Sequence, residues 1–97
     1  MTAKYETIFV LSTKTFDDAA LEATTEKFKA LITDNGGTIE SVDVWGKRKL
    51  AYDINYETEG YYVLVNFEAD TSFPKELDRN YNITTGVLRS IIVRKDA

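Results

Sequence analysis

The residues with the clearest capacity for binding chemistry are three adjacent cations that follow the only tryptophan. They lie in the segment Trp45-Gly46-Lys47-Arg48-Lys49-Leu50-Ala51-Tyr52. Lysine and arginine attract phosphate, and the aromatic side chains offer a large apolar contact area. Because the whole chain has a net charge of -4, this cluster creates a local positive field that the average charge conceals. The segment therefore predicts contact with an anionic partner, although a strand with a solvated, charged bend has the same pattern.

The composition excludes most kinds of catalytic site. The chain contains no histidine and no cysteine, so imidazole acid-base chemistry, thiol nucleophiles, disulfides and the usual zinc sites are ruled out. The remaining polar residues form no nucleophile elbow, phosphate-binding glycine loop or metal-binding loop. A small phosphatase would need an anion-binding loop with a nearby arginine, and the segment Ser12-Thr13-Lys14-Thr15 has neither arginine nor glycine. We therefore expect a protein that is not an enzyme and that uses no cofactor, metal or small-molecule substrate.

The length and composition predict one globular domain over residues 1–97. The chain is 43% hydrophobic and 29% charged, with a single proline, as is typical of a folded protein and not of a disordered one. A chain of 97 residues is large enough to fold unaided and too short for two typical domains. The amino-terminal segment has no apolar export signal, and no run reaches the ~20 apolar residues that span a bilayer. We expect no membrane contact and a cytoplasmic location.

Apolar residues in β-type patterns predict four strands, over residues 5–11, 38–54, 61–69 and 87–94. In the first strand, Thr7, Phe9 and Leu11 share one face, while Ile8 and Val10 share the other. The second strand is long and is expected to bend at Gly46. Residues 55–60 form a turn that joins it to the third strand as an antiparallel hairpin. Every odd position from 61 to 69 in that third strand is apolar, which predicts a core face.

Two segments have the apolar spacing of amphipathic helices. The first is expected to begin at Thr15, which forms a capping-box pattern with Asp18, and to end at Asn35-Gly36-Gly37. Its predicted buried residues recur every three or four positions: Leu21, Thr24, Phe28, Leu31 and Ile32. The second has Thr71 or Ser72 at its cap, Pro74 in its first turn and Asn82 near its end. Its predicted buried residues are Phe73, Leu77 and Tyr81.

The element order predicts an α+β protein with the ferredoxin-like split β-α-β-β-α-β fold, a four-stranded antiparallel sheet with two helices on one face. The other face stays open and gathers Ile8, Val10, Tyr62, Leu64, Arg89, Ile91 and Val93. Apolar surface of this extent on a small domain marks a binding site, so we infer a protein partner there. One alternative is that Ile91 and Val93 line a partly covered core. Another is that Tyr62 stacks on RNA bases, although the sequence after Gly60 lacks the aromatic signature of RNA-recognition modules.

Five segments, in order, resemble the family of the sixth protein of the bacterial small ribosomal subunit. They are Tyr5-Glu6, Asn35-Gly36-Gly37, Trp45-Gly46-Lys47-Arg48 with Leu50-Ala51-Tyr52, Glu59-Gly60-Tyr61-Tyr62, and Val87-Leu88-Arg89 with Ile91-Ile92-Val93. Each segment alone is a weak signal, but their combined order and spacing are specific. The similarity covers nearly the whole chain.

The resemblance implies the same split fold and a function on the ribosome. Members of this family bind the central domain of small-subunit ribosomal RNA as a heterodimer with the eighteenth small-subunit protein. A basic partner would explain how an acidic chain joins an RNA assembly. The resemblance carries RNA-binding roles to Lys47, Arg48 and Arg89, and adding their neighbour Lys49 and the cation before the Tyr5-Glu6 pair gives the predicted RNA-binding set: Lys4, Lys47, Arg48, Lys49 and Arg89. The predicted partner-binding set is Ile8, Val10, Tyr62, Leu64, Ile91 and Val93.

A second hypothesis comes from a different functional class. A ligand-sensing domain of the same topology would pair with itself through the open face, and the fold alone does not distinguish the two. Such a domain would be a stable dimer in isolation, whereas the ribosomal hypothesis predicts a monomer until its partner is added. For Trp45, local packing at the bend is expected over the alternative of a contact to RNA. For Arg79, a solvated helix charge is expected over the alternative of a binding contact.

Overall fold

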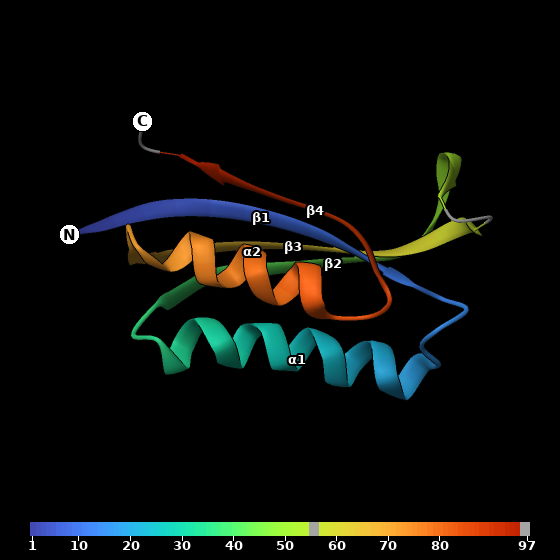
Figure 1. Ribbon diagram of the computed structural model, residues 1–97, viewed down its shortest axis with the longest axis horizontal. Helices are drawn as coiled ribbons and strands as arrows, with labels where there is room; N and C mark the ends of the chain where they lie inside the picture. Colours follow the sequence, from blue (N-terminus) through green and yellow to red (C-terminus); the bar gives the residue numbers. More distant parts are fainter. Residues whose placement is uncertain (55–56, 96–97) are drawn as a thin grey trace.

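The chain folds into one antiparallel sheet with two helices on the same face, as Figure 1 shows. The computed structural model describes residues 1–54 and 57–95, so Asn55 and Tyr56 of the predicted turn lie outside the described residues. The elements are β1 (Thr2–Ser12), α1 (Asp18–Asp34), β2 (Thr38–Ile54), β3 (Glu57–Asp70), α2 (Phe73–Ile83) and β4 (Val87–Arg94). The strands lie in the order β2-β3-β1-β4. The predicted ferredoxin-like split fold is confirmed.

The two inner strands of the sheet are β3 and β1, and β1 pairs with β3 on one side and with β4 on the other. Thr7, Phe9 and Leu11 face the helices and are fully buried, as their alternation predicts. The core-facing positions of β3 lie beside them, and the pairs Phe9 with Val63 and Thr7 with Val65 are directly opposite. Burial of this shared face against the two helices is the main source of stability.

The helices complete the core through the residues that their periodicity predicts, with two changes in α1. Phe73, Leu77 and Tyr81 of α2 are buried, as expected. The buried residues of α1 are Leu21, Thr25, Phe28 and Ile32, so Thr25 takes the place predicted for Thr24, and Leu31 is only partly buried. The hydroxyl of Thr25 donates to the carbonyl of Leu21 at 2.8 Å, which satisfies the polar group within the helix itself.

The amino-terminal cap predicted for α1 is wrong by two residues. The cap is Asp17, whose carboxylate accepts from the backbone N–H of Ala20 at 2.8 Å. Thr15 lies in the preceding turn, where its backbone N–H donates to the hydroxyl of Ser12 at 3.0 Å. The predicted end is confirmed, because Asn35 caps the helix and Gly36 has a φ of +83°, which glycine adopts without strain.

The long β2–β3 hairpin bends at Gly46, as predicted. Its register shifts between Val44 and Gly46, and Gly46 has a φ of +78°. These are the features of a β-bulge, which adds one residue to a strand and re-aims the side chains beyond it. The far end of the hairpin then turns away from the helices, toward the open face (Figure 1).

Candidate protein and RNA interface

The middle of the open face is apolar. Ile8 of β1 lies directly opposite Leu64 of β3 and Ile91 of β4, so the three side chains form a row across the sheet. Val93 extends the row along β4, and the relative exposures of Ile91 and Val93 are 55% and 47%. We call Ile8, Leu64, Ile91 and Val93 the apolar patch. Because Ile91 and Val93 are exposed, the alternative of a partly covered core is wrong for these two residues.

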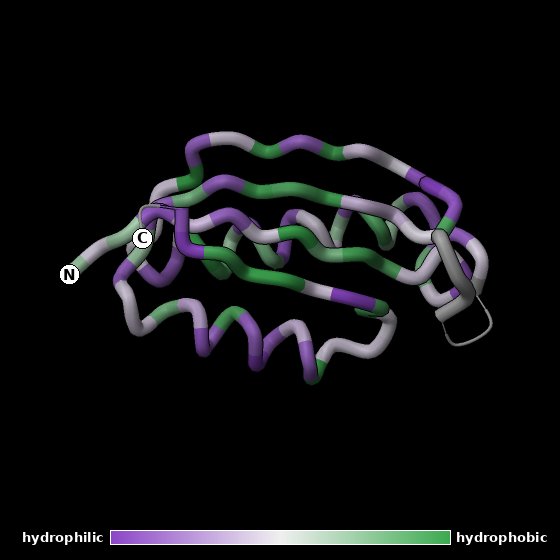
Figure 2. The backbone as a smooth tube through the Cα atoms, turned by 90° about the horizontal axis from the view of Figure 1, so that it is seen from above, coloured by the Kyte–Doolittle hydropathy of each residue, from purple (hydrophilic) through white to green (hydrophobic). Residues whose placement is uncertain are grey.

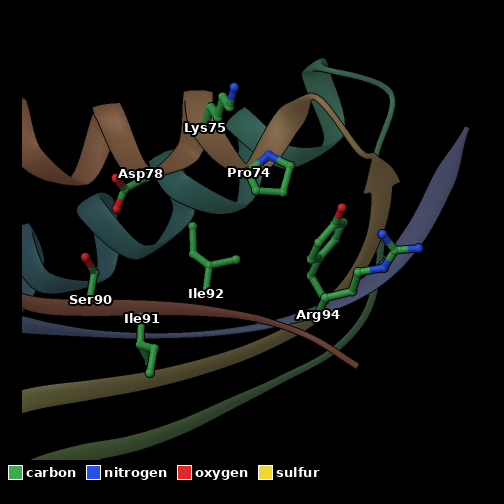
Figure 3. A pocket seen from close by; sticks show the side chains of 8 residues that line it. Pro74, Lys75, Asp78, Ser90, Ile91, Ile92 and Arg94 are labelled. Atoms are coloured by element: carbon green, nitrogen blue, oxygen red, sulfur yellow. The ribbon is translucent and has the colours of Figure 1, made fainter. Parts of the chain in front are cut away.

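Strand alternation decides which residues of β4 reach this face. In Figure 3, Ser90 and Ile92 point toward α2, whereas Ile91 points to the opposite side of the sheet. A wide, open hollow of about 440 Å³ lies on the α2 side, between that helix and β4. Its lining carries both signs of charge, from Lys75, Asp78 and Arg94. Figure 2 shows a hydrophobic stretch in the middle of β4, bounded by hydrophilic residues.

Val10 does not belong to the exposed surface, contrary to the prediction. Its relative exposure is only 3%, although it lies on the open side of β1. A Cβ added at Gly60 would lie 2.4 Å from Val10 Cγ1 and 3.3 Å from Leu50 Cδ2, so the three residues are tightly packed. The curved end of the β2–β3 hairpin therefore covers Val10, and a partner has little direct access to it.

A hollow of about 270 Å³ opens on the same face beside the apolar patch. Its lining consists of Ile8, Val10, Tyr62, Arg89, Ser90 and Ile91. Arg89 lies opposite Val10 in the β1–β4 register and is exposed to solvent. The arrangement places a cation at the edge of an apolar recess, which suits a surface that receives both a side chain and an anionic group.

The structure brings Arg48 and Arg89 to the same end of the open face and separates them from Lys47. In the β2–β3 register Arg48 is opposite Gly60, on the open side, whereas Lys47 is opposite Tyr61, on the helix side. Lys47 Nζ lies 3.0 Å from Asp18 Oδ1 at the start of α1. The hydrogen bond with Asp18 and the charge of Asp18 raise the pKa of Lys47. Lys49, opposite Glu59, also alternates to the helix side.

Lys4 lies at the opposite end of the sheet from the two arginines. It is opposite Glu68 on β3, eight positions along that strand from Gly60, which corresponds to roughly 26 Å. Its Nζ is 3.8 Å from a carboxylate oxygen of Glu40. The five predicted RNA-binding residues therefore do not form one cluster, because only Arg48 and Arg89 share a face and an end.

Trp45 is more exposed than a locally packed anchor would be. Its relative exposure is 39%, and its ring is stacked on Tyr62, with centroids 5.9 Å apart and planes 17° apart. The expectation of local packing at the bend is right in part, since Tyr62 covers one side of the ring. Sequence reasoning did not find this pair, because its members are far apart in the chain and meet only through the hairpin register.

The acidic side chains and the two helices of the described residues bear on two further kinds of site. Within residues 1–54 and 57–95, no three acidic side chains are grouped closely enough to hold a metal ion. Neither α1 nor α2 combines the length and the apolar character needed to cross a bilayer, as judged from the same residues.

Comparison with known proteins gives one consistent result. Residues 4–94 match the family model described as ribosomal protein S6. The chain is 55% identical to the small ribosomal subunit protein bS6 of Clostridium beijerinckii over 92 residues, which cover 95% of this chain and 96% of that protein. It is 52% identical to the bS6 protein of Clostridium botulinum (strain Hall), with coverage of 96% and 98%. The crystal structure of 30S ribosomal protein S6 from Thermotoga maritima superimposes with a TM-score of 0.92 at 28% identity, covering 98% of this chain and 89% of that one.

These similarities cover the whole fold. They agree with the resemblance noted in the sequence and confirm the expectation of a structural protein of the ribosome in place of an enzyme. The chain therefore belongs to the ribosomal protein S6 family of the small ribosomal subunit.

Proposed function

We propose that this chain binds the central domain of small-subunit ribosomal RNA as a heterodimer with the eighteenth small-subunit protein. The observation that carries the proposal is the exposed apolar patch, which lies beside the end of the sheet that holds Arg48 and Arg89. An apolar centre with a charged rim is the usual anatomy of a protein interface. The family resemblance supplies the identity of the partner.

The charge of the chain supports a requirement for that partner. With 16 acidic and 12 basic residues, the chain as a whole is repelled by phosphate. A basic partner bound over the apolar patch would add positive charge next to the two arginines of this chain. The heterodimer would then present one continuous cationic surface to the RNA.

Within this proposal, the position of each cation determines how strongly it contacts the RNA phosphates. Arg48 and Arg89 are the principal phosphate contacts, because they share the open face with the partner site. Lys47 and Lys49 are directed to the other side of β2, and Lys4 lies at the far end of the sheet. We assign these three lysines weaker, longer-range contacts.

The test is the binding of a central-domain RNA fragment by this chain alone, by the partner alone and by both together, over a series of salt concentrations. Tight, salt-sensitive binding is expected only with both proteins present. Each phosphate contact adds roughly 0.9 to the log-log salt slope. Arg48→Gln should therefore lower the slope by about 0.9, while the neighbouring change Lys47→Gln should lower it less.

Two outcomes would overturn the proposal. One is that the partner binds the RNA with the same affinity whether or not this chain is present. The other is a stable homodimer of this chain that does not exchange with the partner, which would favour the self-associating ligand-sensing domain. Sedimentation of the isolated chain separates these cases, since the proposal requires a monomer at micromolar concentration.

A further inference from the structure

The bulge in β2 gives Trp45 an unusual position. Val44 is opposite Val63 and Gly46 is opposite Tyr62, so Trp45 is the extra residue between two paired positions. The left-handed φ of Gly46 makes this geometry accessible without strain. Trp45 is thereby directed onto the open face at the edge strand of the sheet, next to the end that holds Arg48.

The indole ring is held in place from two directions. Tyr62 stacks on one face of the ring, and Asp43 Oδ2 accepts a hydrogen bond from Trp45 Nε1 at 3.0 Å. An indole N–H lies in the ring plane, so Asp43 contacts the edge of the ring and not its second face, and the side chain stays 39% exposed. A ring that is fixed before binding loses little conformational entropy when a partner stacks on it.

Positively charged residues lie on both sides of the stacked rings of Trp45 and Tyr62. Arg48 follows two residues after Gly46 on the same face of β2. Arg89 and Tyr62 line the same hollow and lie on either side of Val10 in the sheet register, so Arg89 is on the inner side of the ring pair. The acidic side chain of Asp43 also lies beside the ring pair, and its carboxylate accepts the hydrogen bond of the indole N–H. Aromatic rings flanked by cations are the usual means of holding single-stranded nucleic acid, in which bases stack and phosphates meet the cations.

We propose that the second face of Trp45 stacks on an unpaired nucleobase of the RNA, and that Arg48 and Arg89 contact the phosphates on either side of it. The base would extend the existing column of Trp45 and Tyr62. A nucleotide within a duplex cannot take this position, because both faces of its base are already stacked. The inference rests on the proposed function and adds the residue and the class of nucleotide that it recognises.

The experiment compares three variants of this chain in the complete heterodimer bound to the central-domain RNA fragment. Trp45→Leu should weaken RNA binding by roughly 5- to 150-fold, the range for the loss of one base-aromatic stack. Trp45→Phe should retain most of the affinity, because a ring remains. Val44→Ala is the matched control, since Val44 is an exposed neighbour directed to the opposite face, and it should have no effect on RNA affinity. The salt slope should be unchanged in all three.

Fluorescence supplies a second, independent measurement. Trp45 is the only tryptophan of this chain, so stacking on a base should quench an emission signal that is missing in Trp45→Phe. Circular dichroism and thermal unfolding of each variant identify any loss of fold. If Trp45→Leu misfolds, the quenching measured on the unmodified chain still tests the proposal.

The outcomes separate the inference from the function on which it rests. Unchanged RNA affinity in Trp45→Leu, or no quenching on RNA binding, would overturn the inference alone. A loss of affinity for the protein partner in the absence of RNA would also overturn it, because it would assign Trp45 to the protein interface. Failure of the unmodified heterodimer to bind the RNA would instead reject the proposed function.

Discussion

The hydroxyl groups of Thr7 and Tyr81 form a buried hydrogen bond of 2.9 Å that joins the central strand β1 to helix α2. Thr7 Oγ1 also donates to the backbone carbonyl of Ile91 at 2.9 Å. Because a threonine hydroxyl has one proton, Tyr81 must be the donor in the first bond. Burial raises the pKa of Tyr81, so this donor stays protonated across the physiological range. These two hydrogen bonds connect α2 to β1 and to β4, the strand that presents Ile91 on the open face.

The first prediction concerns this network. Tyr81→Phe should cost about 1 kcal/mol of unfolding free energy, since Thr7 keeps its bond to the Ile91 carbonyl. Thr7→Val should cost more, about 1–3 kcal/mol, because it leaves the buried Tyr81 hydroxyl without an acceptor. Urea unfolding measures both. A smaller loss in Thr7→Val than in Tyr81→Phe would contradict the assigned donor and acceptor.

The second prediction tests the apolar patch. Ile91→Asp should leave the fold stable, because the side chain is already 55% exposed, and should weaken binding of the eighteenth small-subunit protein by about 30-fold or more. Ile83→Asp is the matched control, since Ile83 is 65% exposed at the end of α2, on the other face of the sheet. Calorimetric titration of each variant with the partner gives the affinities. Equal losses would show that the patch is not the interface.

The third prediction compares two arginines. Arg89→Glu should weaken assembly of the heterodimer with RNA by about 10- to 100-fold, because it reverses a charge beside the partner site. Arg79→Glu should have little effect, because Arg79 lies on α2 and is paired with Glu76 at 2.6 Å. Filter binding of the reconstituted complexes provides the measurement. Similar affinities for the two variants would remove Arg89 from the site.

The fourth prediction concerns pH. Asp70 accepts hydrogen bonds from the backbone N–H and the hydroxyl of Ser72, at 2.9 Å and 2.8 Å, and these bonds lower its pKa. A carboxylate whose pKa is lower in the folded state than its usual value near 3.9 stabilises the fold above that value, and the effect is lost as the pH falls through the folded-state pKa. Asp70→Asn should therefore lower the melting temperature at pH 7, with a difference that shrinks below about pH 4. A difference that stays constant in thermal scans from pH 7 to pH 2.5 would exclude this linkage.

Local chemistry accounts for most of what the sequence predicted. The apolar odd positions of β3 and the four-residue spacing of Phe73, Leu77 and Tyr81 predicted which faces are buried. This works because side chains alternate along a strand and return to the same face of a helix every three or four residues. Gly46 marked the bend, since only glycine adopts its φ without strain. The error at the start of α1 arose because Thr15, Asp17 and Asp18 are all good capping residues, and propensity does not choose among neighbours.

The arrangement of the site depended on contacts between distant parts of the chain. Val10 is buried because the curved hairpin brings Leu50 and Gly60 over it, and no feature near Val10 in the sequence indicates this. The bulge at Gly46 adds one residue to β2 and so reverses the alternation beyond it, which places Arg48 on the open face and Lys47 beside Asp18. The sequence by itself determined the fold, the core faces and the basic character of the bend. Tertiary structure decided which cations share a surface and that Trp45 meets Tyr62, because strand register and hairpin curvature depend on the whole sheet.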